Sequence, residues 1–176
     1  MRVNQKDGDD LVLTSASNYY APGITQQEAE EFYAQRKPAG DPRPVMMGMN
    51  SRLVRDEFGQ LEERVWRVGG LYGPAIERIV AYLEKARSYA CTPEQQVTID
   101  RLIEYYRTGD LRTFDNYCIH WLRDTQSRVD FVNGFTESYG DPMGLKASWE
   151  SIVNFRDDEA TARTVKLSDN ADWFEQ

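Results

Sequence analysis

Histidine and cysteine are scarce in this sequence, which contains one histidine, His120, and two cysteines, Cys91 and Cys118. A catalytic zinc ion usually takes about three nitrogen, oxygen or sulfur ligands, often from two histidines one helical turn apart. His120 has only Asp124 four positions later, and two ligands do not make a site. We therefore expect no metal site in these residues. Two cysteines are too few for a disulfide framework, so a reducing compartment is the simplest expectation.

Positive charge and long apolar runs are also missing. The chain has 21 Lys and Arg residues against 29 Asp and Glu residues, a formal net charge of -8. This balance argues against non-specific nucleic-acid binding and against docking on anionic membranes. No stretch approaches the ~18 consecutive apolar residues of a transmembrane helix. Residues 1–7 contain no apolar signal core, so we expect a cytoplasmic protein, although a signal could precede this segment in a longer chain.

Patterns for nucleophilic catalysis are equally absent. No Gly-x-Ser-x-Gly sequence occurs, and Cys118 lies two positions from His120, a spacing at which helical side chains do not face each other. The glycine-rich stretch 69–73 lacks the lysine and hydroxyl residues of a phosphate-binding loop. It is therefore interpreted as a tight strand-to-helix turn, and no catalytic residue is assigned.

The apolar residues that are present make up 40% of the chain, which is enough for a packed core. Their spacing predicts an α+β fold, with helices packed against a small, mostly antiparallel sheet. Helices are predicted to begin at Thr25, with a capping box to Glu28, and at Pro74, Thr92, Asp110 and about Asp157. A hairpin is predicted over residues 45–68, strands over 11–13 and 127–138, and an extended or helical segment over 148–155.

The strand at 127–138 carries two carboxylates, Asp130 and Glu137, together with Gly134. A strand glycine can mark a place where another backbone comes close, and an extended peptide can add to a strand edge. A carboxylate there could hold the amino terminus of such a peptide. The other interpretation is an ordinary sheet with solvated acidic side chains, and the residues alone leave both open.

Several strings resemble the central region of the dipeptidyl peptidase III family, zinc exopeptidases that remove dipeptides from peptide N-termini. They are residues 14–20 (TSASNYY), 49–54 (MNSRLV), 65–76 (VWRVGGLYGPAI), 105–111 (YYRTGDL), 129–144 (VDFVNGFTESYGDPMG) and 146–154 (KASWESIVN). They occur in order over nearly the whole chain. The resemblance is greatest to the bacterial branch of the family.

The resemblance implies a protein with two lobes that flank a cleft. The upper lobe carries zinc on an HExxGH motif and a later glutamate, both downstream of the present segment. Residues 1–148 then correspond to the lower, substrate-holding lobe, including part of a β-barrel, and residues 149–176 begin the crossing to the upper lobe. We expect the natural sequence to continue past Gln176. Zinc belongs to the full-length enzyme, its partners are peptide substrates and the missing lobe, and the segment alone should be inactive.

The resemblance also implies substrate-binding residues on the strand, namely Asp130, Asn133, Gly134 and Glu137. Asp130 matches a family carboxylate that helps to hold the substrate's amino terminus. Animal members have a tyrosine two residues before the strand glycine, which stabilises the transition state, whereas this chain has Val132 at that position. The rival hypothesis is a non-catalytic peptide-binding or protein-interaction domain with the fold of the lower lobe.

Overall fold

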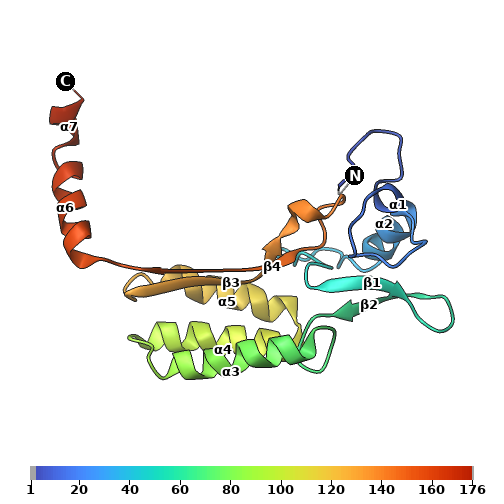
Figure 1. The fold of residues 1–176 in the computed structure, drawn as a ribbon, viewed down its shortest axis with the longest axis horizontal. Helices are drawn as coiled ribbons and strands as arrows, with labels where there is room; N and C mark the ends of the chain where they lie inside the picture. Colours follow the sequence, from blue (N-terminus) through green and yellow to red (C-terminus); the bar gives the residue numbers. More distant parts are fainter. Residues whose placement is uncertain (1–2, 176) are drawn as a thin grey trace.

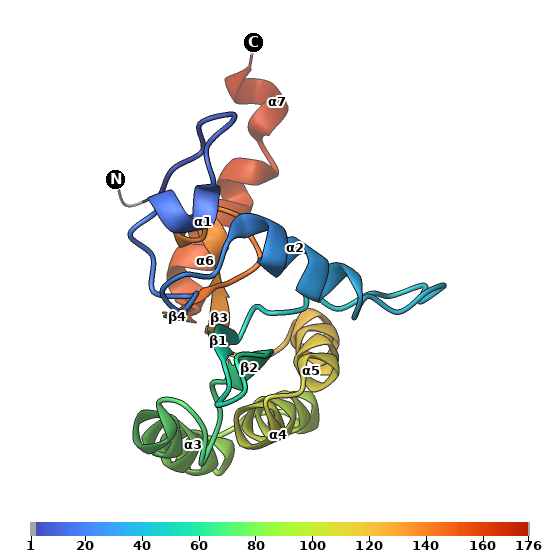
Figure 2. The ribbon, with the colours of Figure 1, turned by 90° about the vertical axis from the view of Figure 1, so that its right-hand side faces the viewer.

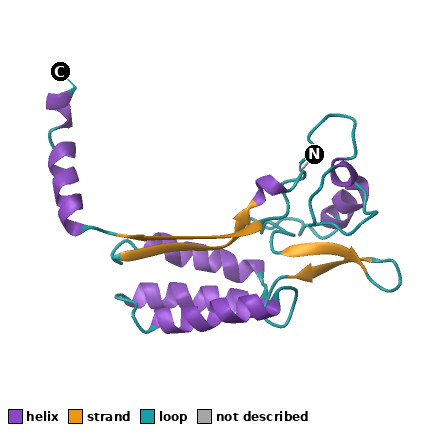
Figure 3. Ribbon diagram, in the orientation of Figure 1, coloured by secondary structure: helices purple, strands orange, loops and turns teal. Residues whose placement is uncertain are grey.

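The computed structural model describes residues 3–175, which form an elongated body with an arm leading to the C-terminus (Figure 1). Helices and strands follow in blocks without strict β-α alternation, which confirms the α+β class (Figure 3). The helices are α1 (Leu11–Thr14), α2 (Gln26–Ala34), α3 (Gly73–Arg87), α4 (Pro93–Thr108), α5 (Leu111–Arg123), α6 (Asp158–Ser168) and α7 (Ala171–Phe174), with a 3-10 turn, η1, at Ser138–Gly140. The strands are β1 (Ser51–Arg55), β2 (Leu61–Val65), β3 (Val129–Glu137) and β4 (Ser148–Phe155).

The start of α2 confirms the predicted capping box. Thr25 Oγ1 accepts a hydrogen bond from the Glu28 backbone N–H at 3.2 Å, and Glu28 Oε2 accepts one from the Thr25 N–H at 3.0 Å. Two donors that the helix cannot pair internally are thereby satisfied. Ala29, Phe32 and Tyr33 form the buried face of this helix.

The short strand predicted at residues 11–13 is wrong, because these residues form α1. Asp10 Oδ1 accepts hydrogen bonds from the backbone N–H groups of Val12 at 3.0 Å and Leu13 at 2.8 Å. A side chain that accepts from backbone donors two and three residues on favours a helical turn over an extended chain. The apolar run thus forms one turn of helix that buries Val12.

The predicted hairpin is present but shorter than the sequence indicated. β1 and β2 pair antiparallel, from Ser51 opposite Val65 to Arg55 opposite Leu61. Asp56 Oδ1 accepts from two backbone N–H groups of the turn, as is typical of aspartate at such positions. Residues 45–47, predicted as strand, are not part of the sheet.

Three helices form a compact layer in which α4 packs between α3 and α5 (Figure 2). The chain turns sharply from α4 to α5 at Gly109, which ends α4 with φ 73°, a left-handed conformation that favours glycine. A Cβ atom on Gly109 would also lie 2.4 Å from Cγ1 of Val65. Gly109 therefore ends α4, and β2 packs against this helix end.

The second pair of strands forms a ribbon that lies along α5 (Figure 1). β3 and β4 pair antiparallel from Val129 opposite Phe155 to Glu137 opposite Ser148, with an irregularity between Phe135 and Glu137. The described residues thus contain two separate two-stranded sheets and no closed barrel. The last helix of the sequence prediction is divided into α6 and α7, whose residues are almost all exposed.

A buried lysine joins the β3–β4 connection to the N-terminal half of the chain. Lys146 Nζ is fully buried; it donates to the hydroxyl of Tyr33 and, at 2.9 Å, to Ser51 Oγ, and lies 3.5 Å from Glu63 Oε1. Burial lowers the pKa of Lys146 to about 8, against the opposing effect of Glu63. The ammonium group therefore ties α2, β1 and β2 to the segment that precedes β4.

Asp141 fixes the same connection from its other end. Its Oδ2 accepts from the hydroxyl of Tyr20 at 3.0 Å and from the backbone N–H groups of Leu145 and Lys146 at 2.8 Å each.

Among the described helices, none is long and apolar enough to cross a membrane.

Candidate functional site

The predicted substrate-binding residues all lie on β3, but they do not gather at one point. Asp130 lies opposite Asn154 near one end of the ribbon, and Glu137 lies opposite Ser148 at the other. Seven residues of strand separate the two carboxylates, which corresponds to about 23 Å. One amino terminus cannot contact both carboxylates, so at most one of them anchors it.

Asp130 is exposed and is held by α5. Its Oδ1 accepts a hydrogen bond from the indole Nε1 of Trp121 at 2.8 Å. Its other carboxylate oxygen has no hydrogen-bond partner among the residues that the structure describes. A cationic amine could therefore approach that oxygen without displacing an existing contact.

Asn133 belongs to a chain of hydrogen bonds that crosses the ribbon to α4. Tyr106 donates its hydroxyl hydrogen to Asn133 Oδ1, and the same hydroxyl oxygen accepts from Trp149 Nε1 at 2.8 Å. Asn133 Nδ2 in turn donates to Ser151 Oγ at 3.2 Å. Burial raises the pKa of Tyr106, so the phenol keeps its proton at neutral pH. The amide of Asn133 is thus held in one orientation.

Gly134 allows close packing of α5 beneath the strand. A Cβ atom at this position would lie 2.9 Å from Cε2 of Phe114 and 3.2 Å from its Cζ. The close neighbour is therefore an aromatic side chain of the same chain. This packing gives Gly134 a structural role, and its contact with a substrate backbone stays a prediction.

Glu137 lies beside a second carboxylate that the sequence did not single out. Glu150 of β4 forms a side-chain hydrogen bond with Glu137, and this contact is the largest cause of the raised pKa of Glu150. A carboxylate next to another carboxyl group disfavours the charged form of Glu150. The pair marks the end of the ribbon as acidic.

Tyr139 is the residue that sequence reasoning missed at this end. It lies in η1, two residues after Glu137, with 73% of its surface exposed. In the expected family pattern the carboxylate and the tyrosine both precede the strand glycine, here Gly134. Asp130 and Val132 occupy those two positions, whereas Glu137 and Tyr139 follow the glycine.

Metal ligands do not gather in this part of the chain. No group of three or more His, Cys, Asp or Glu side chains among residues 3–175 lies close enough to hold an ion. His120 Nδ1 is 2.6 Å from Glu94 Oε1, an isolated pair that joins α5 to α4. A zinc site cannot be built from the described residues, so we derive no step through a metal.

The arrangement of these elements is similar to that of two solved structures. The structure of DPP III from Caldithrix abyssi superposes with a TM-score of 0.66 at 20% identity, over 97% of this chain and 32% of that chain. The dipeptidyl-peptidase III from Corallococcus sp. strain EGB gives a TM-score of 0.63 at 18% identity, over 87% of this chain and 27% of that chain. These likenesses establish the fold.

Sequence comparison gives the family. The model of Peptidase family M49 matches residues 49–175, and the chain belongs to this family. Dipeptidyl peptidase 3 of Mus musculus is 29% identical over 124 residues, 70% of this chain and 16% of that protein. The protein of the same name from Dictyostelium discoideum is 29% identical over 107 residues, 61% of this chain and 16% of its own length. The chain therefore spans about a sixth of these relatives and 27–32% of the two solved structures.

Proposed function

We propose that this chain forms the substrate-holding part of a peptidase that releases dipeptides from peptide N-termini. Membership of Peptidase family M49 and the names of its relatives support the reaction. The observation that carries the proposal is the β3–β4 ribbon, which has carboxylates along β3 and no further strand among the described residues. An extended peptide can add to such an edge through main-chain hydrogen bonds, with a carboxylate to hold its amine.

The zinc ion of such an enzyme would have to be bound outside the described residues, since these contain no group of ligands. We therefore propose that a second lobe supplies it, with the general base, and that residues 1–176 alone are inactive. The exposed apolar residues of β4, α6 and α7, among them Phe155, Leu167 and Trp173, support contact with further protein. Residues 149–155 are paired with β3. We therefore propose that the part of the chain that crosses toward the second lobe begins at α6.

The natural reading frame gives the first test. An HExxGH sequence in its continuation is the expected result, and a stop codon directly after Gln176 would refute the enzyme. Peptide binding without hydrolysis in the complete protein would instead support the non-catalytic interaction domain. A bacterial source and a cytoplasmic location stay predictions.

The anchor for the amino terminus is tested by two matched variants in the complete enzyme. Asp130 is the first candidate, because one of its oxygens is free. Glu137 is the second, because it is the other carboxylate predicted on β3 to bind substrate. If Asp130 is the anchor, Asp130→Asn raises KM for dipeptidyl substrates at least tenfold, as loss of a charge-assisted hydrogen bond would, and Glu137→Gln does not. The reverse result assigns Glu137, and unchanged kinetics in both variants removes β3 from the site.

A further inference from the structure

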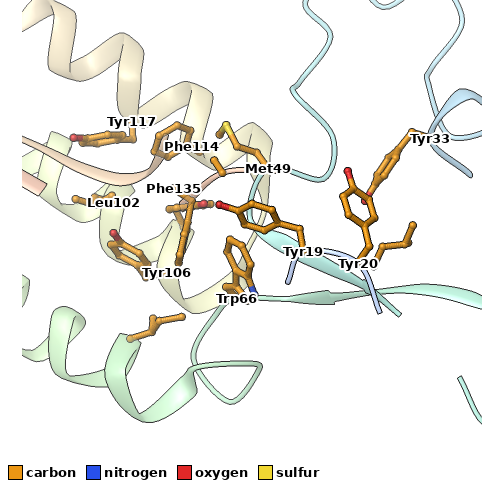
Figure 4. Packing of buried hydrophobic residues seen from close by; sticks show 14 of the residues in the cluster. Tyr19, Tyr20, Tyr33, Met49, Trp66, Leu102, Tyr106, Phe114, Tyr117 and Phe135 are labelled. Carbon is orange, nitrogen blue, oxygen red and sulfur yellow. The ribbon is translucent and has the colours of Figure 1, made fainter. Parts of the chain in front are cut away.

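A second site is formed where the start of α3 meets the end of the β3–β4 ribbon. It is a pocket of about 800 Å³ whose walls are largely apolar. Five aromatic side chains line it, and we name it the Trp66 pocket: Tyr19, Trp66, Tyr72, Phe135 and Trp149. Figure 4 shows Tyr19, Trp66 and Phe135 as neighbours in the core. A volume of this size is in the range of small-ligand sites.

The rings of the Trp66 pocket are packed at its base and open at its rim. The ring of Trp66 is buried, with ring centroids 4.7 Å from Phe135 and 6.1 Å from Tyr19. Tyr72 and Trp149 at the rim are 55% and 43% exposed. Covering these rim surfaces with an apolar group removes them from water, which favours binding.

Charge at the Trp66 pocket has a single sign. Arg78 of α3 lines the pocket, and no aspartate or glutamate does so. The helix positions three and four residues from Arg78 hold proline, alanine and tyrosine, so no acidic residue of α3 can pair with it. Among residues 3–175 Arg78 forms no hydrogen bond or ion pair, whereas Arg87, also of α3, is paired with Asp100. The pocket thus combines apolar walls with an unpaired guanidinium group.

We propose that the Trp66 pocket binds the carboxyl-terminal residue of a peptide, with a bulky apolar side chain among the rings and the terminal carboxylate on Arg78. A guanidinium group matches a carboxylate with two parallel N–H···O bonds. A cationic ligand would meet Arg78 with no carboxylate to offset it, and a phosphate would gain nothing from the rings. A peptide carboxyl terminus carries both matching features within one residue.

This site selects the opposite end of a peptide from the one that the carboxylates of β3 would hold. The two regions meet at Ser148, which lines the Trp66 pocket and lies opposite Glu137 in the ribbon. Asp130 lies about seven strand residues away, or about 23 Å. The inference does not depend on peptidase activity, because it concerns binding by the present residues only.

Titration of the chain with N-acetyl-phenylalanine, followed by calorimetry, tests the proposal. We expect saturable binding, and about tenfold weaker binding of N-acetyl-phenylalaninamide, which has no carboxylate. Arg78→Gln should reduce the affinity for the acid to that for the amide. Lys85→Gln, on the same helix but outside the pocket, is the matched control and should bind as the parent does. Equal binding of acid and amide, or tighter binding of phenethylamine, would overturn the proposal.

A variant that fills the pocket separates this site from weak binding elsewhere. Ala75 lines the pocket and is exposed, so Ala75→Trp should abolish binding while the far-UV circular dichroism spectrum stays unchanged. Asp130→Asn should leave binding intact, which keeps this result independent of the β3 proposal. Persistent binding in the folded Ala75→Trp variant refutes the site.

The chain itself offers a competing occupant. Trp173 and Phe174 are exposed at the end of the arm, and Asp172 and Glu175 flank them. The arm of a second copy could therefore place an aromatic ring in the pocket and a carboxylate on Arg78. If the pocket binds a peptide carboxyl terminus, N-acetyl-phenylalanine binds equally well to the parent chain and to the variant in which Trp173 and Phe174 are replaced by serine. If binding appears only after Trp173→Ser and Phe174→Ser convert a dimer to a monomer in light scattering, the second copy is the occupant.

Discussion

Replacing Lys146 by methionine removes the buried cation that ties the segment before β4 to the N-terminal half of the chain. Methionine has a similar length and no charge, so the change isolates the ammonium group. The variant loses the hydrogen bonds to Tyr33 and Ser51 and the 3.5 Å contact with Glu63. Glu63 is left as a carboxylate without its cation.

The expected loss follows from the geometry of the pair. Removing one partner of a buried ion pair costs about 3–5 kcal/mol in the free energy of unfolding. The side chain of Glu63 is 24% exposed and still accepts from Tyr33 and Ser51, so water and these donors offset part of the loss. We therefore expect about 3 kcal/mol, or a fall in Tm of about 6–12 °C for a chain of this length.

Urea unfolding at pH 7, followed by circular dichroism, measures the effect. Lys166→Met on the exposed arm is the control and should change the free energy by less than about 0.5 kcal/mol. Lys146→Met combined with Glu63→Gln removes both charges and should recover much of the loss, because no unpaired charge remains. The reasoning is refuted if Lys146→Met is as stable as the parent, or if the double variant is no better than the single one.

Three further predictions concern stability. The pKa of Lys146 is about 8 in the folded chain and near 10.4 when unfolded, so between these values the unfolded state binds more protons. Stability relative to Lys146→Met should therefore rise by about 1 kcal/mol per unit from pH 8 to 10, and a parallel pH profile for the variant would contradict this. Above pH 10 the stability of both chains should fall, because burial raises the pKa values of tyrosines in the folded chain while the unfolded chain loses those protons. Gly134→Ala should cost about 1–3 kcal/mol in urea unfolding because its Cβ meets the ring of Phe114, and Phe114→Leu in the same chain should reduce that cost. Thr25→Ala should cost about 1 kcal/mol through loss of the helix cap, whereas Thr25→Ser should be nearly neutral, and equal losses in both would argue against the cap.

Local structure could be predicted from the sequence because its causes lie within a few residues. The capping box at Thr25 depends on neighbours in the chain, and it was found where the pattern placed it. The spacing of apolar residues gave the position of β3, and β4 formed over residues 148–155, for which extended and helical structure had both been left open. The strand prediction for residues 11–13 was wrong because the Asp10 side chain caps a helical turn there, and the spacing of apolar residues does not reveal such a cap.

The sequence alone determined the family, the α+β class and the strand on which to look for a site. Only the tertiary structure decided how that strand is used, because its partners come from distant segments. It separates Asp130 from Glu137, fills the space at Gly134 with Phe114, and buries Lys146 against Ser51, 95 residues away. Such contacts depend on which helix or strand reaches which face, and no pattern of nearby residues encodes that choice.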